Sequence, residues 1–191
     1  LKIGMAGFKQ LLAGAEAMDQ HYRTTPLEHN LPVLLAMTGI WNINILGLKA
    51  QTILPYDGRL KTLPNYLSQL EMESNGKTVT SDGSRTARDA SPVIGGDVGA
   101  NAQHAYFQLL HQGTPAFYAD FIVPVRRTPS NGYSKDTQVQ LQCQQELNLA
   151  NCIAQSRVLM MGDSVLQWED SCEKSPDRLY SGNHASTTID R

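Results

Sequence analysis

Short apolar segments alternate with segments of helical spacing, and this alternation constrains the fold more than any other feature of the chain. Strands are expected at about residues 50–56, 91–95 and 118–125. Helical periodicity occurs at 3–22, 31–47, 59–73, 103–114 and 135–161. Strands joined through helices pair in parallel, and helices cover both faces of a parallel sheet. We therefore predict an α/β fold, a three-layer sandwich in which a small, mainly parallel sheet is flanked by helices. Three strands make a small sheet, which we expect to be incomplete.

Other segments carry local signals. Residues 31–47 are apolar nearly all round, which is typical of a helix buried on most sides. The turn formers of 80–86 (TSDGSRT) predict a turn or hairpin tip. Gly113 closes the helix at 103–114, a natural position for a left-handed cap. After Gly162 the chain is polar, and we expect irregular structure there.

Length and charge exclude several classes of protein. The 191 residues are enough for one domain with a hydrophobic core. The formal net charge of -2 leaves no basic excess to hold a nucleic acid backbone, and the apolar stretches are too short to span a bilayer. We therefore expect no nucleic-acid partner and no membrane partner. Cys143, Cys152 and Cys172 fit neither a zinc site nor a disulfide framework, and predict buried or idle thiols in a reducing compartment.

Both ends of the chain read as interrupted. The first residue is Leu1 rather than Met, and the last segment, LYSGNHASTTIDR, is polar without a closing element. We expect residues 1–191 to form a single partial domain that belongs to a longer chain. Within it we predict a helical lead-in at 1–48, an α/β core at 49–162 and an irregular tail at 163–191.

The loop from Gly95 to Asn101 follows a predicted strand, where open α/β sheets bind ligands. Its glycines expose backbone amides beside a helix N-terminus, an arrangement that suits an anion. The alternative is that the glycines only form a tight turn, and local sequence does not separate the two. No Gly-Lys-Ser/Thr follows, so the loop is not a nucleotide-binding P-loop.

Two histidines lie on the predicted helix after this loop. His104 falls in its first turn, where the helix dipole disfavours an imidazolium, and a neutral imidazole there could exchange a proton with a bound hydroxyl. The alternative is a surface or packed histidine. His111 lies two turns further, about 10 Å along the helix, too far to share a metal ion with His104. We interpret His111 as structural, with a partner in the loop after Gly113.

Glu73 ends the helix predicted at 59–73, just before Asn75-Gly76 turns the chain. The negative end of the helix dipole disfavours a charged carboxylate there, so Glu73 could both accept and return a proton. Gln69 is one turn earlier on the same face and could bond a substrate hydroxyl. The alternative is an exposed glutamate before an Asn-Gly turn. Asp97 and Asp57 are further acidic candidates, and Asp57 more simply caps the helix that follows it.

Two specific motifs carry a resemblance to a known family. PYDGRLKTLPNYLSQLEMESNGK (55–77) and GANAQHAYFQLLHQGT (99–114) together resemble the glucose-6-phosphate isomerase family, also called phosphoglucose isomerase. The helical segment before them, and DFIVPV and LANCIAQSRVLMMGDS after them, are similar to the same family. The resemblance covers nearly the whole chain.

The resemblance implies a fold and a setting. Family members consist of two sugar-isomerase (SIS) domains, and this chain would be most of the second. They are cytosolic homodimers that use no metal or other cofactor, and they interconvert glucose 6-phosphate and fructose 6-phosphate in glycolysis and gluconeogenesis. A sugar phosphate and a second copy of the chain are therefore the implied partners.

The resemblance also implies roles for three residues. Glu73 would be the base that moves a proton between C1 and C2 through a cis-enediol. Gln69 would lie beside the substrate. His104 would help to open the sugar ring, and would reach the site of the partner subunit.

The chain departs from the family pattern in the loop before His104. The family usually has Trp-Gly-Glu-Pro-Gly-Thr-Asn-Gly-Gln-His, whereas this chain has Gly95-Gly96-Asp97-Val98-Gly99-Ala100-Asn101-Ala102-Gln103-His104. The family's phosphate-binding serines and threonines would lie before Leu1, so we expect the isolated chain to be inactive. The alternatives are an SIS-type module that binds a sugar phosphate without turnover, or a decayed partial copy.

Overall fold

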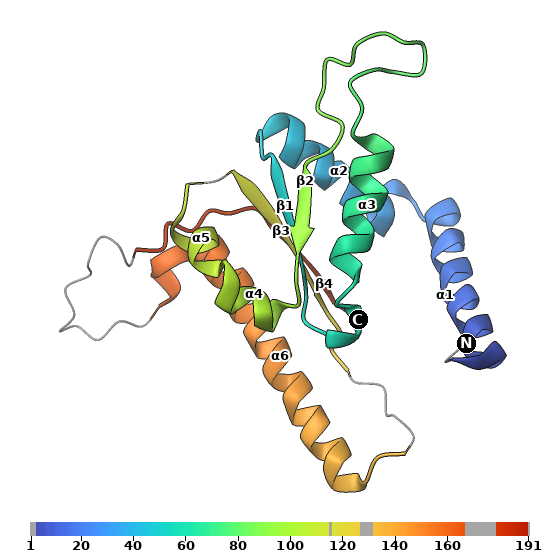
Figure 1. Cartoon of the computed structure of the whole chain (residues 1–191), viewed down its shortest axis with the longest axis vertical. Coiled ribbons are helices and arrows are strands. Elements are labelled where there is room, and N and C mark those ends of the chain that lie inside the picture. Colours follow the sequence, from blue (N-terminus) through green and yellow to red (C-terminus); the bar gives the residue numbers. More distant parts are fainter. Residues whose placement is uncertain (1–2, 115, 127–131, 167–178, 191) are drawn as a thin grey trace. The chain divides into compact units, whose positions relative to one another are not determined.

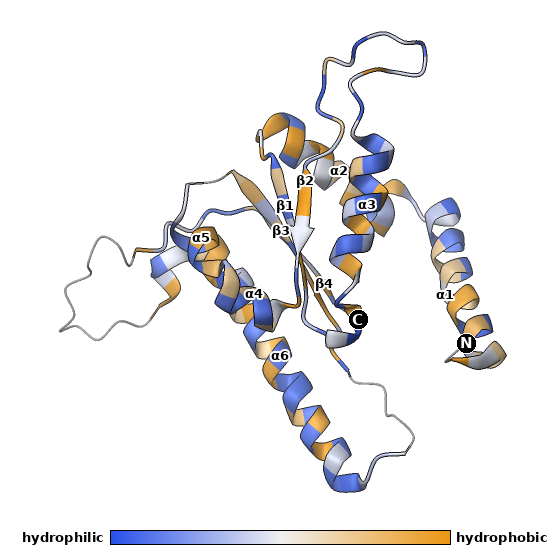
Figure 2. Cartoon of the chain, in the orientation of Figure 1, coloured by the Kyte–Doolittle hydropathy of each residue, from blue (hydrophilic) through white to orange (hydrophobic). Residues whose placement is uncertain are grey.

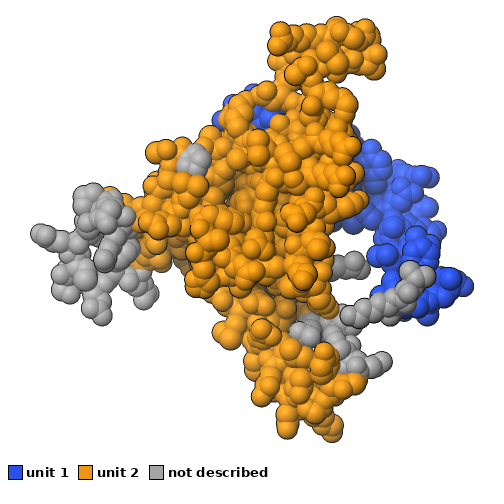
Figure 3. Space-filling model, in the orientation of Figure 1, with its two compact units in different colours: residues 1–46 blue, residues 47–191 orange. Residues whose placement is uncertain are grey.

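The chain is described by a computed structural model at residues 3–114, 116–126, 132–166 and 179–190. It divides into two compact units, Leu1–Leu46 and Gly47–Arg191 (Figure 3).

Unit 1 is helical. It contains α1 (Gly4–Thr24), the short 3-10 helix η1 (Leu27–His29), α2 (Leu31–Ile40) and a π-helical turn, η2 (Trp41–Ile45). Asn30 ties α1 to α2: its amide nitrogen donates to the Tyr22 carbonyl at 2.7 Å, and its amide oxygen accepts from the backbone N–H of Val33 at 3.3 Å. The second bond caps the start of α2, because the first N–H groups of a helix have no partner within it. The predicted helix at 3–22 is confirmed.

The prediction that 31–47 is one helix buried on most sides is wrong in two respects. The α-helix ends at Ile40 and continues as the π turn, and no residue of α2 is buried. Figure 2 shows α2 as predominantly apolar, yet the side chains of Leu31, Met37 and Trp41 are each more than half exposed. An apolar pattern indicates which faces favour burial, but burial itself needs neighbouring side chains.

Unit 2 is built on a four-stranded parallel sheet. The strands are β1 (Ala50–Pro55), β2 (Val93–Gly96), β3 (Phe117–Val123) and β4 (Ser186–Asp190), in the order β2-β1-β3-β4. The three predicted strands are confirmed within a few residues. The prediction of an irregular segment after Gly162 is wrong, because residues 186–190 pair with β3. Their polar sequence, STTID, carries no strand pattern of its own.

The strand order places the helices on opposite faces of the sheet. Crossovers between parallel strands are right-handed, and the step from β1 to β2 runs in the opposite direction to the steps from β2 to β3 and from β3 to β4. The helix α3 (Leu63–Asn75) therefore covers one face (Figure 1). The other face is covered by α4 (Gly99–Ala105), α5 (Phe107–Gln112) and α6 (Lys135–Met161). The predicted α/β sandwich with helices on both faces is confirmed.

The main core lies on the face covered by α4, α5 and α6. Alternate residues of β1 and β3 point into it and pack against side chains of these helices; its buried members are Leu54, Tyr56, Ala102, Phe107, Leu110, Phe117, Ala119, Phe121, Val123, Cys152 and Leu159. Cys152 is buried and Cys143 is exposed, whereas Cys172 lies outside the described residues.

On the opposite face, α3 also protects the edge of the sheet. The backbone N–H and C=O of Ile94 point away from β1; the Ser68 hydroxyl donates to this carbonyl at 3.2 Å, and the Met72 sulfur accepts from this N–H at 3.4 Å. An edge strand otherwise presents unpaired backbone groups.

The predicted helix at 103–114 is two helices. The chain breaks at Tyr106, whose φ of -147° is not helical, so α4 runs from Gly99 to Ala105 and α5 from Phe107 to Gln112. Gly113 is extended, with φ -83° and ψ 177°, so the expected left-handed cap is also wrong. Helix α4 begins earlier than predicted, at Gly99, which lies directly against the ring of Tyr56.

This contact leads to a stability prediction. A Cβ atom at Gly99 would lie 2.2 Å from the ring of Tyr56, which is 2% exposed, so Gly99→Ala is expected to lower the free energy of unfolding by about 1–3 kcal/mol. Gly95→Ala is the matched control because its Cβ would enter open space, and we expect a change within about 0.5 kcal/mol. Urea unfolding measures both variants. Equal stability of the two would contradict this account of the start of α4.

Candidate functional site

The last turn of α3 carries the pair predicted from sequence. Gln69 donates from Nε2 to Oε2 of Glu73 at 3.3 Å, and both side chains lie at the surface. The helix continues to Asn75, two residues beyond the predicted end at Glu73. Lys77 then closes the helix, because its ammonium donates to the carbonyls of Glu73 and Ser74, both at 2.7 Å. Cationic groups stabilise the carbonyl end of a helix, so Lys77 holds the turn that presents Glu73.

His104 lies on a different helix from the one expected. It occupies the last turn of α4 rather than the first turn of a longer helix, so the argument that a helix N-terminus favours its neutral form is wrong. The side chain is exposed, and among the described residues it makes no hydrogen bond.

The structure does not bring Glu73 and His104 together within one chain. Glu73 is on α3 and His104 is on α4, which cover opposite faces of the sheet (Figure 1). The side chains of β3 support this assignment. Phe117 and Phe121 point toward α4, α5 and α6, whereas Tyr118 points the other way, where burial and then the Asp120 and Glu71 carboxylates raise its pKa. Glu71 is a residue of α3.

The glycine loop is shorter than predicted. Strand β2 extends to Gly96 and α4 starts at Gly99, so only Asp97 and Val98 connect them. Asp97 uses one carboxylate oxygen to accept from the N–H of Val98 at 2.7 Å. A Cβ at Gly96 would lie 2.0 Å from the carbonyl oxygen of Ile53. Close approach of the chain therefore explains Gly96 here, as it does Gly99 against the ring of Tyr56, and the tight-turn interpretation is the better supported one.

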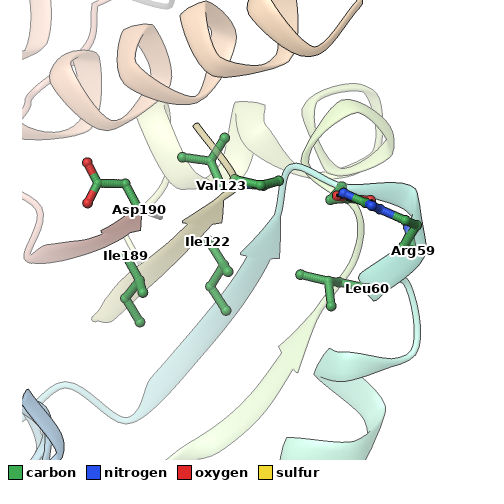
Figure 4. Close-up of a pocket in the computed structure, with 8 residues that line it drawn as sticks. Arg59, Leu60, Ile122, Val123, Ile189 and Asp190 are labelled. Carbon is green, nitrogen blue, oxygen red and sulfur yellow. Dashed lines mark hydrogen bonds and ion pairs between the residues drawn. The ribbon is translucent and has the colours of Figure 1, made fainter. Parts of the chain in front are cut away.

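Sequence reasoning missed a pocket at the carboxyl edge of the sheet. It has a volume of about 260 Å³ and lies at the ends of β1, β3 and β4, with Arg59 and Leu60 on one side and Ile122, Ile189 and Asp190 on the other (Figure 4). The chain leaves β1 and β3 in opposite directions, and ligands of open α/β sheets bind where the strand order reverses in this way. Of the residues that line the pocket, the sequence indicated only Asp57, which follows β1, as a candidate, because the order of the strands cannot be predicted from the sequence.

Asp57 combines two structural roles in this pocket. It caps the short helix η3 (Gly58–Leu60) as predicted, because its Oδ1 accepts from the N–H of Arg59 at 2.8 Å. The Arg59 guanidinium also holds the same carboxylate from two nitrogens, with Nε at 3.0 Å from each oxygen. The two charges neutralise each other, so this pair leaves no free carboxylate for acid–base chemistry.

His111 is a packed residue, as predicted, but with a different partner. It is 7% exposed, and its Nε2 lies 2.8 Å from Oε1 of Gln155 on α6, not near the loop after Gly113. Its ring centroid lies 5.0 Å from that of Tyr180, and the ring of His184 stacks on Phe117 at 4.8 Å. Burial lowers the pKa of His111, and it lowers that of His184 together with the nearby His111.

Two features are absent from the part of the chain that the structure describes. There, no three His, Cys, Asp or Glu residues gather as they would around a metal ion. No helix of the same residues combines the length and apolar character needed to cross a membrane.

The fold and the strand order define a class. A parallel sheet with α3 on one face and α4 to α6 on the other is an α/β sandwich of the type found in sugar-isomerase domains. A crystal structure of a glucose-6-phosphate isomerase from Chlamydia trachomatis superimposes with a TM-score of 0.78 and 34% sequence identity, over 96% of this chain and 34% of that one.

Sequence comparisons then identify the family. The model of the phosphoglucose isomerase family matches residues 1–190. Glucose-6-phosphate isomerase 2 of Chromohalobacter salexigens is 57% identical over 189 residues, and glucose-6-phosphate isomerase of Psychrobacter cryohalolentis is 51% identical over 193 residues. The chain belongs to the phosphoglucose isomerase family. It spans about a third of the length of these relatives, 33% and 34% respectively.

The buried histidine leads to a prediction about pH. Because the pKa of His111 is lower in the folded chain than in the unfolded one, the unfolded chain binds more protons in mild acid. The stability linked to His111 is therefore fully present above about pH 6.5 and is lost as the pH falls below it. His111→Gln is expected to flatten the fall of the unfolding free energy between pH 7 and 5, measured by urea titration, whatever its stability at pH 7.

His104→Gln is the matched control, because it removes an exposed imidazole from the same unit. We expect it to leave the pH slope unchanged. If the unfolding free energy of His111→Gln falls with pH as steeply as that of the unsubstituted chain, burial of this ring is not the source of the pH dependence.

Proposed function

We propose that this chain is most of the second SIS domain of a glucose-6-phosphate isomerase, which interconverts glucose 6-phosphate and fructose 6-phosphate in the cytoplasm. The observation that carries the proposal is the exposed, hydrogen-bonded pair of Glu73 and Gln69 at the end of α3, within the MESNGK motif of a phosphoglucose isomerase family member. The relatives with this name are matched over 99% of the chain.

Glu73 acts as the base of the isomerisation. Its carboxylate removes the C2 proton of the open-chain aldose, which gives a cis-enediolate with its charge on O1. The O2 hydroxyl proton then passes to O1, Glu73 returns its proton to C1, and the C2 carbonyl of the ketose forms. Three features suit this role: the carboxylate is exposed, Gln69 restrains it, and Lys77 fixes the turn from which it projects. Gln69 lies beside the substrate, and its side-chain amide can hydrogen-bond either to Glu73 or to a sugar hydroxyl.

His104 assists ring opening in the site of a second copy of the chain. The separation of Glu73 and His104 by the sheet supports this division, because one sugar bound at Glu73 is out of reach of the same chain's α4. The exposed position of His104, without a hydrogen bond to a described residue, leaves it available to another subunit. The functional unit is accordingly a homodimer.

Replacing Glu73 tests the base. We would transplant residues 1–190 into the matching third of the Chromohalobacter salexigens relative and follow fructose 6-phosphate conversion in a coupled assay. Glu73→Gln is expected to lower kcat by at least about 100-fold, because an amide cannot take up the proton. The isolated chain is expected to show no turnover beside it.

Glu146→Gln is the control for Glu73→Gln. Glu146 is exposed on α6 and accepts from Gln142, one turn earlier, at 3.1 Å. This pair has the same spacing and hydrogen bond as Gln69 and Glu73, and its Glu→Gln substitution removes the same charge. We expect its kcat to stay within about twofold, as for a neutral surface change. Activity of Glu73→Gln equal to that of this control would exclude Glu73 as the base. An inactive unsubstituted chimera that recovers when residues 95–102 take the relative's sequence would favour sugar-phosphate binding without turnover.

Mixing two inactive variants tests the role of His104. If each site combines Glu73 of one subunit with His104 of the other, a mixed dimer of Glu73→Gln and His104→Gln contains one intact site. Random exchange of subunits should therefore restore about a quarter of the unsubstituted activity. No recovery after verified exchange would mean that both residues serve a site within one chain.

A further inference from the structure

The connection between α3 and β2 forms a second pocket, which no step of the proposed isomerisation uses. It has a volume of about 330 Å³ and is lined by residues 76–78 and 85–91. We call it the hairpin pocket, because these residues lie at the base of a hairpin that projects from unit 2 (Figure 3). Three of its side chains are cationic: Lys77, Arg85 and Arg88.

The backbone around the pocket is held by hydrogen bonds. Val79 and Arg85 form an antiparallel bridge, which confirms the hairpin predicted at 80–86. The Thr86 N–H donates to the Thr78 carbonyl at 2.9 Å on one side of the bridge. At the tip, Asp82 accepts from the N–H and the hydroxyl of Ser84 at 3.0 and 2.7 Å. Arg85 therefore projects from a closed hairpin rather than from an open loop.

The charges of the pocket do not balance. Its one carboxylate, Asp89, is in an ion pair with Lys49 at the base of β1. Arg85 and Arg88 are exposed, and neither forms an ion pair with a residue that the structure describes. Lys77 occupies the carbonyls of Glu73 and Ser74, and so covers the negative end of α3 that would otherwise repel an anion.

We propose that the hairpin pocket binds a small phosphate-type oxyanion between Arg85 and Arg88. A guanidinium presents its N–H donors as a fork that matches two oxygens of a phosphate group, and Arg85 and Arg88 line this pocket with two such forks. The ammonium of Lys77 adds a third positive charge at the same pocket, and it forms no ion pair with a carboxylate that the structure describes. The volume accommodates an inorganic diphosphate or the phosphate end of a metabolite.

A titration with inorganic pyrophosphate tests the proposal. We would add it to the isotope-labelled 191-residue chain at constant ionic strength and follow backbone amide and arginine side-chain signals. Saturable shifts centred on residues 76–78 and 85–91 are expected, with a Kd below about 1 mM. Arg85→Gln/Arg88→Gln should weaken binding at least about tenfold, because charge-assisted hydrogen bonds are lost.

Arg126→Gln/Arg157→Gln is the matched control, because it removes two exposed arginines of the same unit that lie outside the pocket. It should bind pyrophosphate as the unsubstituted chain does, and unchanged amide spectra elsewhere verify that both variants fold. An equal loss of pyrophosphate affinity in the control would show that overall surface charge, and not the hairpin pocket, causes the binding. That result, or shifts that do not saturate or that centre elsewhere, would overturn the proposal.

Discussion

The pairing of β1 between β2 and β3 is the interaction on which the arrangement of this molecule depends. Parallel strands can only be joined by crossovers, and right-handed crossovers on either side of β1 send α3 to one face and α4, α5 and α6 to the other. The same pairing creates the pocket at the carboxyl edge, since the chain leaves β1 and β3 in opposite directions. It also separates Glu73 from His104. The positions of the proposed catalytic residues thus follow from strand order rather than from local contacts.

Local sequence predicted the parts of the fold that local interactions decide. The boundaries of α6 were correct, and β1, β2 and β3 were apolar enough to be placed within a few residues. Strand β4 was missed because STTID becomes a strand only by pairing with β3, whose partner residues lie 67 positions earlier in the chain. The start of α4 was missed because Gly99 is helical where the ring of Tyr56 lies against it. Such contacts are tertiary, and no periodicity reports them.

The candidate site shows the same division. Gln69 and Glu73 could be paired from their spacing, because residues four apart share a helix face. The electrostatic argument for His104 failed because it depended on a helix boundary, the least reliable feature of a sequence pattern. The carboxyl-edge pocket could not be predicted because it depends on strand order, and the charge balance of the hairpin pocket could not because it depends on the ion pair between Asp89 and Lys49. The exposed pair of Asp89 with Lys49 contributes little stability, yet this pair and that of Asp57 with Arg59 decide which charges remain available.

An aldose–ketose isomerisation needs a group that opens the ring and a base that acts on C1 and C2 of the same sugar. With the roles proposed for Glu73 and His104, their positions on opposite faces of one sheet would offer only one of them to any bound sugar. Under this proposal, association of two copies is a condition of the chemistry. A change that weakens association would abolish turnover even with Glu73, Gln69 and His104 intact, and dilution alone would lower the specific activity. Residues that hold the two copies together would in this way act on catalysis without touching the substrate.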